Sequence, residues 1–88
     1  MFEWDAAKRL RVLHDRGLDF EDATQVFDGR PAIHLQARRN DEDRVVTTAE
    51  INGKLYTVVW TWRGLNQRII SFRRARDVEE RAYRAAHS

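Results

Sequence analysis

The sequence predicts a small α+β domain, in which an antiparallel β-sheet packs against two N-terminal helices and is followed by a C-terminal helix. Three patterns predict this class. Apolar residues recur at helical spacing as far as Phe27, side chains alternate with the period of a strand between Ile33 and Arg74, and helical spacing returns after Asp77. With 88 residues, the chain is expected to form one domain, residues 1–88, around a single core.

The first helix is predicted to begin after Asp5, whose side chain can accept a hydrogen bond from the first turn. It follows a short extended segment, residues 2–4, and ends at Gly17, which tolerates the left-handed conformation that closes many helices. A second helix is predicted from a cap at Asp19 to a stop at Gly29.

The predicted strands comprise a segment around Ile33 and Leu35, then residues 44–51, 54–62 and 68–74. Between the middle two lies Asn52-Gly53, a strong signal for a two-residue hairpin turn. Such a turn places Ile51 opposite Lys54 and, further along, Val45 opposite Trp60. Residues 38–43 are predicted to form a charged turn, and the strands form an antiparallel meander.

The final helix is predicted to start at Asp77, with Glu80 three residues later completing a capping box. Val78, Ala82 and Ala85 give this helix a narrow apolar stripe.

The net charge of +2 conceals an uneven distribution. Residues 1–43 carry seven basic and ten acidic side chains, whereas residues 44–88 carry nine basic and four acidic ones. Fourteen of the 16 basic residues are arginine, whose guanidinium stays protonated and binds phosphate through two parallel hydrogen bonds. A basic half beside an acidic half indicates an anionic partner on one side only.

Several classes of site are not supported by the composition. The chain has no cysteine for disulfides or a Cys-based zinc site, and its three histidines lack metal-ligand spacing, so no metal site and no cofactor are predicted. No apolar run approaches the ~18 residues that span a bilayer, and the N-terminus lacks the pattern of a signal peptide. We therefore expect a soluble, cytoplasmic protein.

An arginine cluster is the candidate catalytic site. The cluster consists of Arg44, which follows the charged turn, and of Arg68, Arg73 and Arg74 on the last strand. Such groups can stabilise the charge that builds on phosphorus during RNA cleavage. The alternative is a solvated face whose arginines pair with neighbouring acids.

RNA cleavage also needs one group to accept the 2′-OH proton and one to protonate the leaving 5′-oxygen. Glu79 or Glu80 and Tyr83 are candidates, since Glu79 and Tyr83 lie four residues apart on one helix face. For either glutamate the alternative is an exposed ion pair with an arginine.

Trp60 and Trp62 lie two apart on a predicted strand and therefore point to the same face. Aromatic faces can stack nucleobases, although in so small a chain the core is the alternative, favoured for Trp60. Trp62, at the strand end, is the candidate RNA-binding aromatic. The candidate RNA-binding residues are Trp62, Arg63, Arg76 and Arg81.

Six segments of the chain carry a resemblance to a known family. In chain order they are residues 2–5 (FEWD) with Lys8, residues 17–23 (GLDFEDA), Arg44 after the acidic turn, Asn52-Gly53 with residues 56–61 (YTVVWT), residues 68–75 (RIISFRRA) and residues 79–83 (EERAY). Together they resemble the BrnT-type toxins of bacterial toxin–antitoxin pairs. The resemblance covers nearly the whole chain, and the block at residues 68–73 is its most specific part.

This resemblance implies a RelE-like ribonuclease fold and an endoribonuclease toxin whose metal-independent RNA cleavage arrests growth in a stress response. It also implies a cognate, BrnA-like antitoxin that covers the active face and represses the shared operon. Similar complexes contain two copies of each protein, which implies a toxin–antitoxin heterotetramer. By position, Arg44, Arg68, Arg73 and Arg74 would handle RNA, with the segment from Glu79 to Tyr83 beside them.

The sequence departs from this family at several positions. Val12, Asp15 and Arg16 stand where members often have Asn, Lys and His, and Ala49 stands in place of a glycine. If the missing Lys-His pair takes part in cleavage, activity would be weak; if it only shapes the turn, little is lost.

Two other functions fit the arginines equally well. One is a non-catalytic nucleic-acid-binding module that uses the same side chains and Trp62. The other is a protein-interaction domain that docks an acidic partner. The resemblance, rather than the arginines, favours the ribonuclease.

Overall fold

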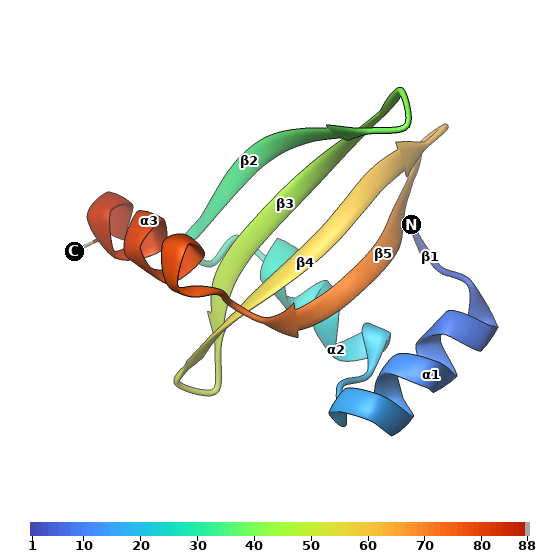
Figure 1. Ribbon diagram of the computed structural model, residues 1–88, viewed down its shortest axis with the longest axis horizontal. Coiled ribbons are helices and arrows are strands. Elements are labelled where there is room, and N and C mark those ends of the chain that lie inside the picture. Colours follow the sequence, from blue (N-terminus) through green and yellow to red (C-terminus); the bar gives the residue numbers. More distant parts are fainter. Residues whose placement is uncertain (88) are drawn as a thin grey trace.

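The computed structural model describes residues 1–87, which form a five-stranded mixed sheet with helices on both faces (Figure 1). The elements are β1 (Phe2–Glu3), α1 (Ala6–Arg16), α2 (Phe20–Ala23), the 3₁₀-helix η1 (Thr24–Phe27), β2 (Ala32–Arg39), β3 (Glu42–Ile51), β4 (Lys54–Arg63), β5 (Asn66–Arg74) and α3 (Asp77–His87). The predicted α+β class is confirmed.

The sheet has the strand order β1-β5-β4-β3-β2, in which β2 to β5 form an antiparallel meander. The extended segment at the N-terminus adds β1 parallel to β5, with Phe2 opposite Gln67 and Glu3 opposite Arg68. The predicted antiparallel meander is present in β2 to β5, but the sheet as a whole is mixed. The Phe2 ring packs 5.5 Å from the Phe27 ring, which helps hold β1 at this edge.

Two tight turns join β2 to β3 and β3 to β4. Asn52 and Gly53 both have positive φ, 51° and 81°, the combination that a type I′ turn requires. Val45 lies opposite Trp60, the partner that a two-residue turn imposes. Asn40 and Asp41 also have positive φ, 53° and 61°, and form the turn between β2 and β3. The other four residues of the predicted charged turn belong to these two strands.

A β-bulge interrupts β5. Val59 pairs with Ser71, whereas Trp60 pairs with Ile69, which leaves Ile70 as an extra residue. Because one extra residue reverses the side-chain alternation, Arg68 faces the same side of the sheet before the bulge as Arg73 does after it.

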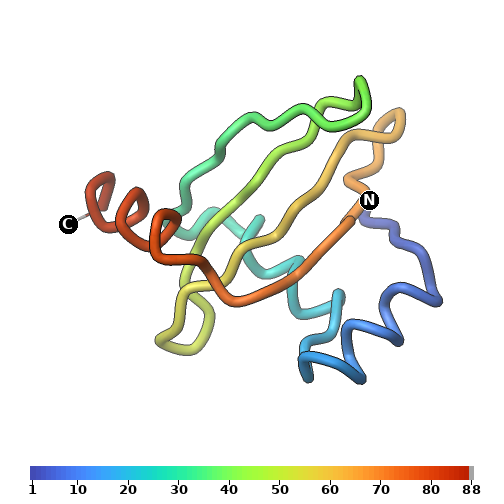
Figure 2. Tube along the Cα trace, viewed as in Figure 1, coloured from blue at the N-terminus to red at the C-terminus, as the bar shows by residue number. Residues whose placement is uncertain are grey.

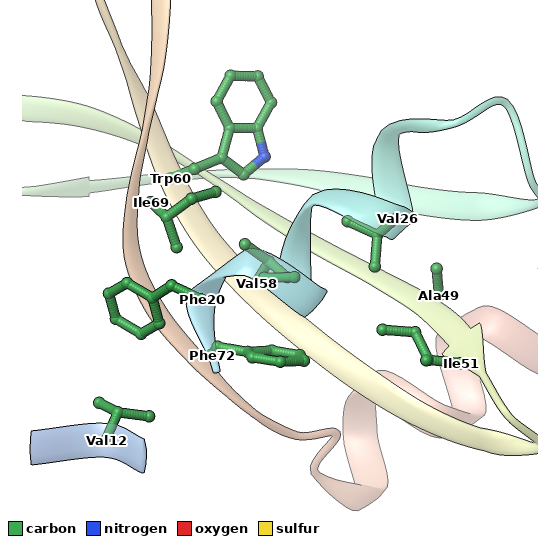
Figure 3. Packing of buried hydrophobic residues seen from close by; sticks show 10 residues of the cluster. Val12, Phe20, Val26, Ala49, Ile51, Val58, Trp60, Ile69 and Phe72 are labelled. Atoms are coloured by element: carbon green, nitrogen blue, oxygen red, sulfur yellow. The ribbon is translucent and has the colours of Figure 1, made fainter. Parts of the chain in front are cut away.

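The core lies on the sheet face that α2 and η1 cover (Figure 3). Phe20, Val58, Ile69 and Phe72 are almost fully buried there. Trp60 is also buried, with Phe27 edge-on at 5.2 Å and its indole N–H donating to Thr47 Oγ1 at 2.9 Å. Trp60 thus belongs to the core, as the structural alternative predicted. We call this the α2 face and the opposite side the α3 face.

The first helix has the predicted bounds, whereas the second is shorter than predicted. Asp5 caps α1 by accepting a hydrogen bond from the Lys8 N–H at 2.9 Å, and Gly17, with φ of 68°, closes it. The predicted second helix is a single turn, Phe20–Ala23, that tightens into the 3₁₀-helix Thr24–Phe27. In Figure 2 the chain starts beside β5, while α3 ends near the opposite edge of the sheet, which β2 forms. None of the helices within residues 1–87 has the length and apolar character needed to cross a membrane.

Candidate nucleic-acid interface

A basic pocket of about 290 Å³ lies where α1 passes the edge of β5. The residues that line this basic pocket are Asp5, Lys8 and Arg11 from the start of the first helix, Glu42 and Arg44 from β3, Arg63 from β4, and Arg68, Ile69 and Ile70 from β5. Five cationic side chains therefore meet two carboxylates, and the surplus of positive charge suits an anion.

Two contacts hold α1 at this edge. At its N-terminal end, α1 follows β1, which pairs with β5 at Arg68. At its C-terminal end, Arg16 Nη1 donates to the backbone oxygen of Phe72 at 3.0 Å. Lys8 and Arg11, three residues apart, are thereby held on one side of the basic pocket and Arg68 on another.

The two most enclosed arginines of the basic pocket each contact one carboxylate. Arg68 Nη1 donates to Glu3 Oε2 at 2.7 Å, and Arg44 Nε donates to Glu42 Oε1 at 3.3 Å. The hydrogen bond from Arg68 lowers the pKa of Glu3, assisted by one from Asn66. Each guanidinium has five N–H donors, so these single contacts orient it and leave other donors for an anion. The predicted alternative of pairing with acids is thus partly correct.

Lys8 differs from the other cations of the basic pocket because its ammonium can release a proton. Burial lowers the pKa of Lys8, and the positive charges of Arg44 and Arg11 lower it further. An ammonium whose pKa is lowered in this way is a stronger acid, and so a better proton donor, than that of an ordinary lysine. Arginine cannot replace it in that role, because its guanidinium does not release a proton.

Arg73 does not belong to the basic pocket, which corrects the prediction that it converges with Arg68. Its Nη1 and Nη2 atoms donate to the two oxygens of Glu79 at 2.7 and 2.9 Å. The two side chains are only 17% and 10% exposed. Glu79 also accepts from Thr57 Oγ1 at 3.0 Å and from the Arg76 N–H at 2.8 Å. Together these residues form a buried ion-pair cluster beneath α3.

The contacts of Glu79 in this cluster do not favour the proton-transfer role that was predicted for it. The Arg73 guanidinium lowers the pKa of Glu79 to about 2, against the opposing effect of burial, so its carboxylate is a weak base. Tyr83, one turn further along α3, is half-buried with its ring 5.0 Å from that of His87 and does not line the basic pocket. Glu80 pairs with Arg84 at 3.3 Å, as the alternative for this residue predicted.

The helix cap also differs from the prediction. The backbone oxygen of Arg76 accepts from the Glu80 N–H at 2.9 Å, so Arg76 occupies the N-cap position that was predicted for Asp77. The side chain of Glu79, three residues later, accepts a hydrogen bond from the Arg76 N–H. The carboxylate of the capping box is thus the one that holds Arg73.

Arg74 lies on the opposite, α2 face of the sheet, where it is paired with Tyr56 across the strands. Its guanidinium lies 5.4 Å from the centre of the Tyr56 ring, and its Nε donates to the backbone oxygen of Leu55 at 3.3 Å. Arg73 and Arg74 are adjacent on a strand and so point to opposite sides. The four predicted arginines therefore do not share one pocket: Arg44 and Arg68 line the basic pocket, whereas Arg73 and Arg74 do not.

A family model for the "ribonuclease toxin, BrnT, of type II toxin-antitoxin system" matches residues 4–79 of the chain. The chain belongs to the BrnT family. The match includes every residue that lines the basic pocket and ends at Glu79. No curated protein sequence matches the chain. The family is one of type II toxin–antitoxin systems, so an antitoxin is the partner class for this chain.

Within this BrnT chain, the predicted RNA-binding side chains are spread over several places. Arg63 lines the basic pocket, whereas Arg76 is exposed at the start of α3. Arg81 is exposed in a shallow hollow of α3 with Asp77 and Glu80. Trp62 is 57% exposed and stands edge-on to Trp60 at 5.3 Å.

Trp62 lies in an acidic part of the BrnT surface. It lines a hollow with Asp41, Glu42 and Asp43, which repel a phosphate backbone. Within residues 1–87, no group of three His, Asp or Glu side chains is arranged to hold a metal ion.

Sequence reasoning missed two cationic residues of the basic pocket, Lys8 and Arg11, and its two carboxylates, Asp5 and Glu42. Lys8 had one signal, since it is the only lysine in the first half of the chain and part of the family-like opening. Nothing local to α1 indicated that it lies beside Arg44 and Arg68, because that proximity depends on the pairing of β1 with β5.

The buried ion-pair cluster should make the stability of this BrnT protein sensitive to acid. Because the pKa of Glu79 is about 2 in the folded state against an ordinary value of 4.5, its contribution is complete above pH ~4.5 and is lost as the pH falls toward ~2. That shift corresponds to about 3 kcal/mol. Urea unfolding of the wild-type protein and of Glu79→Gln, compared between pH 7 and pH 2.5, should show their difference shrinking in acid. A difference independent of pH would contradict this assignment.

Proposed function

We propose that this chain is a metal-independent endoribonuclease toxin with a RelE-like fold, which cleaves RNA at the basic pocket and arrests growth. The observation that carries the proposal is the meeting of Lys8, Arg44 and Arg68, with Arg11 and Arg63 at the margin. Membership of a ribonuclease toxin family supports the same reaction class.

In the proposed reaction, Arg44 and Arg68 bind the non-bridging oxygens of the scissile phosphate. The 2′-oxygen of the ribose attacks phosphorus, and the bond from phosphorus to the 5′-oxygen breaks. The 2′-OH proton passes to the Asp5 carboxylate of the basic pocket, and the Lys8 ammonium protonates the departing 5′-oxygen. The products are a 2′,3′-cyclic phosphate and a 5′-hydroxyl end.

The arginines act by stabilising charge. Negative charge grows on the phosphate as the fifth bond to phosphorus forms, and guanidinium donors already aimed at that position need little reorganisation. The contacts with Glu3 and Glu42 supply this preorganisation, since they fix the direction of Arg68 and Arg44 before RNA arrives.

The direct test is incubation of the purified protein with end-labelled single-stranded RNA in the presence of EDTA. Cleavage into fragments with cyclic phosphate ends is expected. Intact RNA that is nevertheless bound, with affinity that falls steeply with salt, would instead support the non-catalytic nucleic-acid-binding module. If the protein binds no RNA but binds an acidic peptide, it is the interaction domain.

Replacement of Lys8 tests the proton-transfer step. Lys8→Arg keeps the positive charge but removes a dissociable proton, so kcat should fall by about 10²–10⁴-fold while RNA affinity is retained. Lys8→Ala should weaken both. Single-turnover cleavage and fluorescence anisotropy separate the two effects. Wild-type rates in Lys8→Arg would exclude Lys8 as the proton donor.

The proposed neutralising partner is a BrnA-like antitoxin, encoded beside the toxin, in a complex with two copies of each protein. Co-expression with the neighbouring reading frame should relieve growth inhibition, and light scattering of the co-purified complex should give the mass of a heterotetramer. Unrelieved growth arrest would show that the neighbouring protein is not the antitoxin.

A further inference from the structure

A second cationic pocket lies at the other end of β5. It is lined by Arg16 from the end of α1, Leu18 from the turn that follows, Tyr56 from β4, and Arg73 and Arg74 from β5, and it encloses about 520 Å³. We call it the Tyr56 pocket. None of its residues lines the basic pocket, so the two are separate places on the surface.

Two of the three arginines in the Tyr56 pocket carry charge that no carboxylate within residues 1–87 balances. Arg73 is neutralised by Glu79. Arg16 donates instead to the Phe72 oxygen and the Ser71 hydroxyl, and Arg74 donates to the Leu55 oxygen.

These neutral contacts hold the two guanidinium groups in place without cancelling their charge. Arg16 and Arg74 are both exposed, so an anion can reach them from solvent. A phosphodiester that bridges them would receive charge-assisted hydrogen bonds from both sides.

The aromatic ring gives the Tyr56 pocket a second kind of contact. The Arg74 guanidinium already lies over the Tyr56 ring at 5.4 Å. Arginine guanidinium groups and aromatic rings are both surfaces on which an unstacked nucleobase can stack. Leu18 adds an apolar wall. Phosphate donors and a stacking plane side by side suit a nucleotide better than a lone carboxylate.

The two pockets are aligned along the same pair of elements. Lys8 and Arg11 on α1 and Arg68 on β5 line the basic pocket, while Arg16 on the same helix and Arg74 on the same strand line the Tyr56 pocket. Arg68 and Arg74 are six residues apart, which is about 20 Å on an extended strand. They face opposite sides of the sheet, so an RNA strand that contacts both crosses the edge of β5.

We propose that the Tyr56 pocket binds a flanking nucleotide of the RNA strand that is cut in the basic pocket. Its phosphate lies between Arg16 and Arg74, and its base stacks on the Arg74–Tyr56 pair. This inference rests on the proposed function for its ligand, but it concerns binding rather than cleavage. It gives Arg74 a role in holding RNA instead of the catalytic one that the sequence suggested, and it gives a role to Arg16.

The test uses a fluorescent 2′-O-methyl RNA dodecamer, which cannot be cleaved because its 2′-oxygens are blocked. Arg16→Gln combined with Arg74→Gln should raise Kd by at least tenfold, and Arg74→Gln alone, which leaves the contact from Arg16 to Phe72 that holds α1, should also raise it. The slope of log affinity against log salt should fall by about 0.7 for each phosphate that the variant no longer neutralises. Circular dichroism and thermal melting check that the variant is folded.

The matched control is Arg38→Gln combined with Arg84→Gln, which removes the same charge from side chains that are 63% and 67% exposed elsewhere. It should bind the dodecamer nearly as well as the wild-type protein. Equal binding by the two double variants would overturn the proposal. If the Arg16 and Arg74 variant loses an acidic peptide but not the dodecamer, the occupant is a protein and the proposal is also wrong.

These outcomes are independent of the cleavage result. A protein that leaves natural RNA intact, yet needs Arg16 and Arg74 to hold the dodecamer, would refute the nuclease and retain the Tyr56 pocket as an RNA site. A protein that cleaves RNA, but binds the dodecamer equally well without these two side chains, would support the nuclease and refute the Tyr56 pocket as an RNA site.

Discussion

Replacing both Arg44 and Arg68 by alanine is expected to abolish RNA cleavage and growth inhibition. Both side chains line the basic pocket, each oriented by one carboxylate contact. Removal of one preorganised donor to a developing oxyanion lowers kcat by about 10²–10³-fold, so each single substitution should have an effect of that size. In the proposed reaction both arginines act on the same phosphate. The reduction in kcat in the double variant should therefore be smaller than the product of the two single reductions.

Single-turnover cleavage of labelled RNA measures the change, with growth curves after induction as the cellular readout. Arg38→Ala combined with Arg84→Ala, which removes two charges from exposed positions, is the control and should retain activity. The Arg44 and Arg68 variants must also keep the wild-type circular dichroism spectrum. Full activity in a folded double variant would eliminate the basic pocket as the site of cleavage.

Replacing Arg73 by alanine is expected to destabilise the fold rather than to remove a catalytic group. It would leave the Glu79 carboxylate buried without its countercharge, which costs about 3–5 kcal/mol. For a domain of this size such a loss is a large fraction of the total stability. Urea unfolding at pH 7 should show a correspondingly lower midpoint.

The double variant Arg73→Ala with Glu79→Ala separates stability from catalysis. With both charges gone, Thr57 keeps its 2.8 Å hydrogen bond with Thr48, and much of the lost stability should return. Cleavage should recover along with the fold. An Arg73→Ala protein that unfolds like the wild type but cannot cut RNA would restore the catalytic assignment of this residue.

Local signals in the sequence were sufficient to predict much of the sheet. Asn52 and Gly53 accept positive φ, which a two-residue turn needs, and such a turn fixes every pair that follows it along β3 and β4. The shortening of the second helix was not predictable in this way, because Phe20 and Val26 are buried whether the chain is α-helical or 3₁₀.

The arginine cluster was only partly predictable. That Arg73 and Arg74 point to opposite faces follows from strand alternation alone and could have been anticipated. That Arg68 shares a face with Arg73 could not, because it depends on the extra residue at Ile70, for which the sequence carries no turn signal. The predicted cap, Asp77 with Glu80, lies one residue beyond the observed one, Arg76 with Glu79, and no signal in the sequence indicated that Glu79 is the buried partner of Arg73.

The parallel pairing of β1 with β5 has a consequence for synthesis of the protein. Phe2 and Glu3 cannot pair with β5 until Gln67 and Arg68 have been synthesised, some 65 residues later. Contacts so distant in sequence form late, after neighbouring hairpins such as β3–β4. The basic pocket of a nascent chain is therefore incomplete until residues as far as Ile70 have been synthesised and have left the exit tunnel.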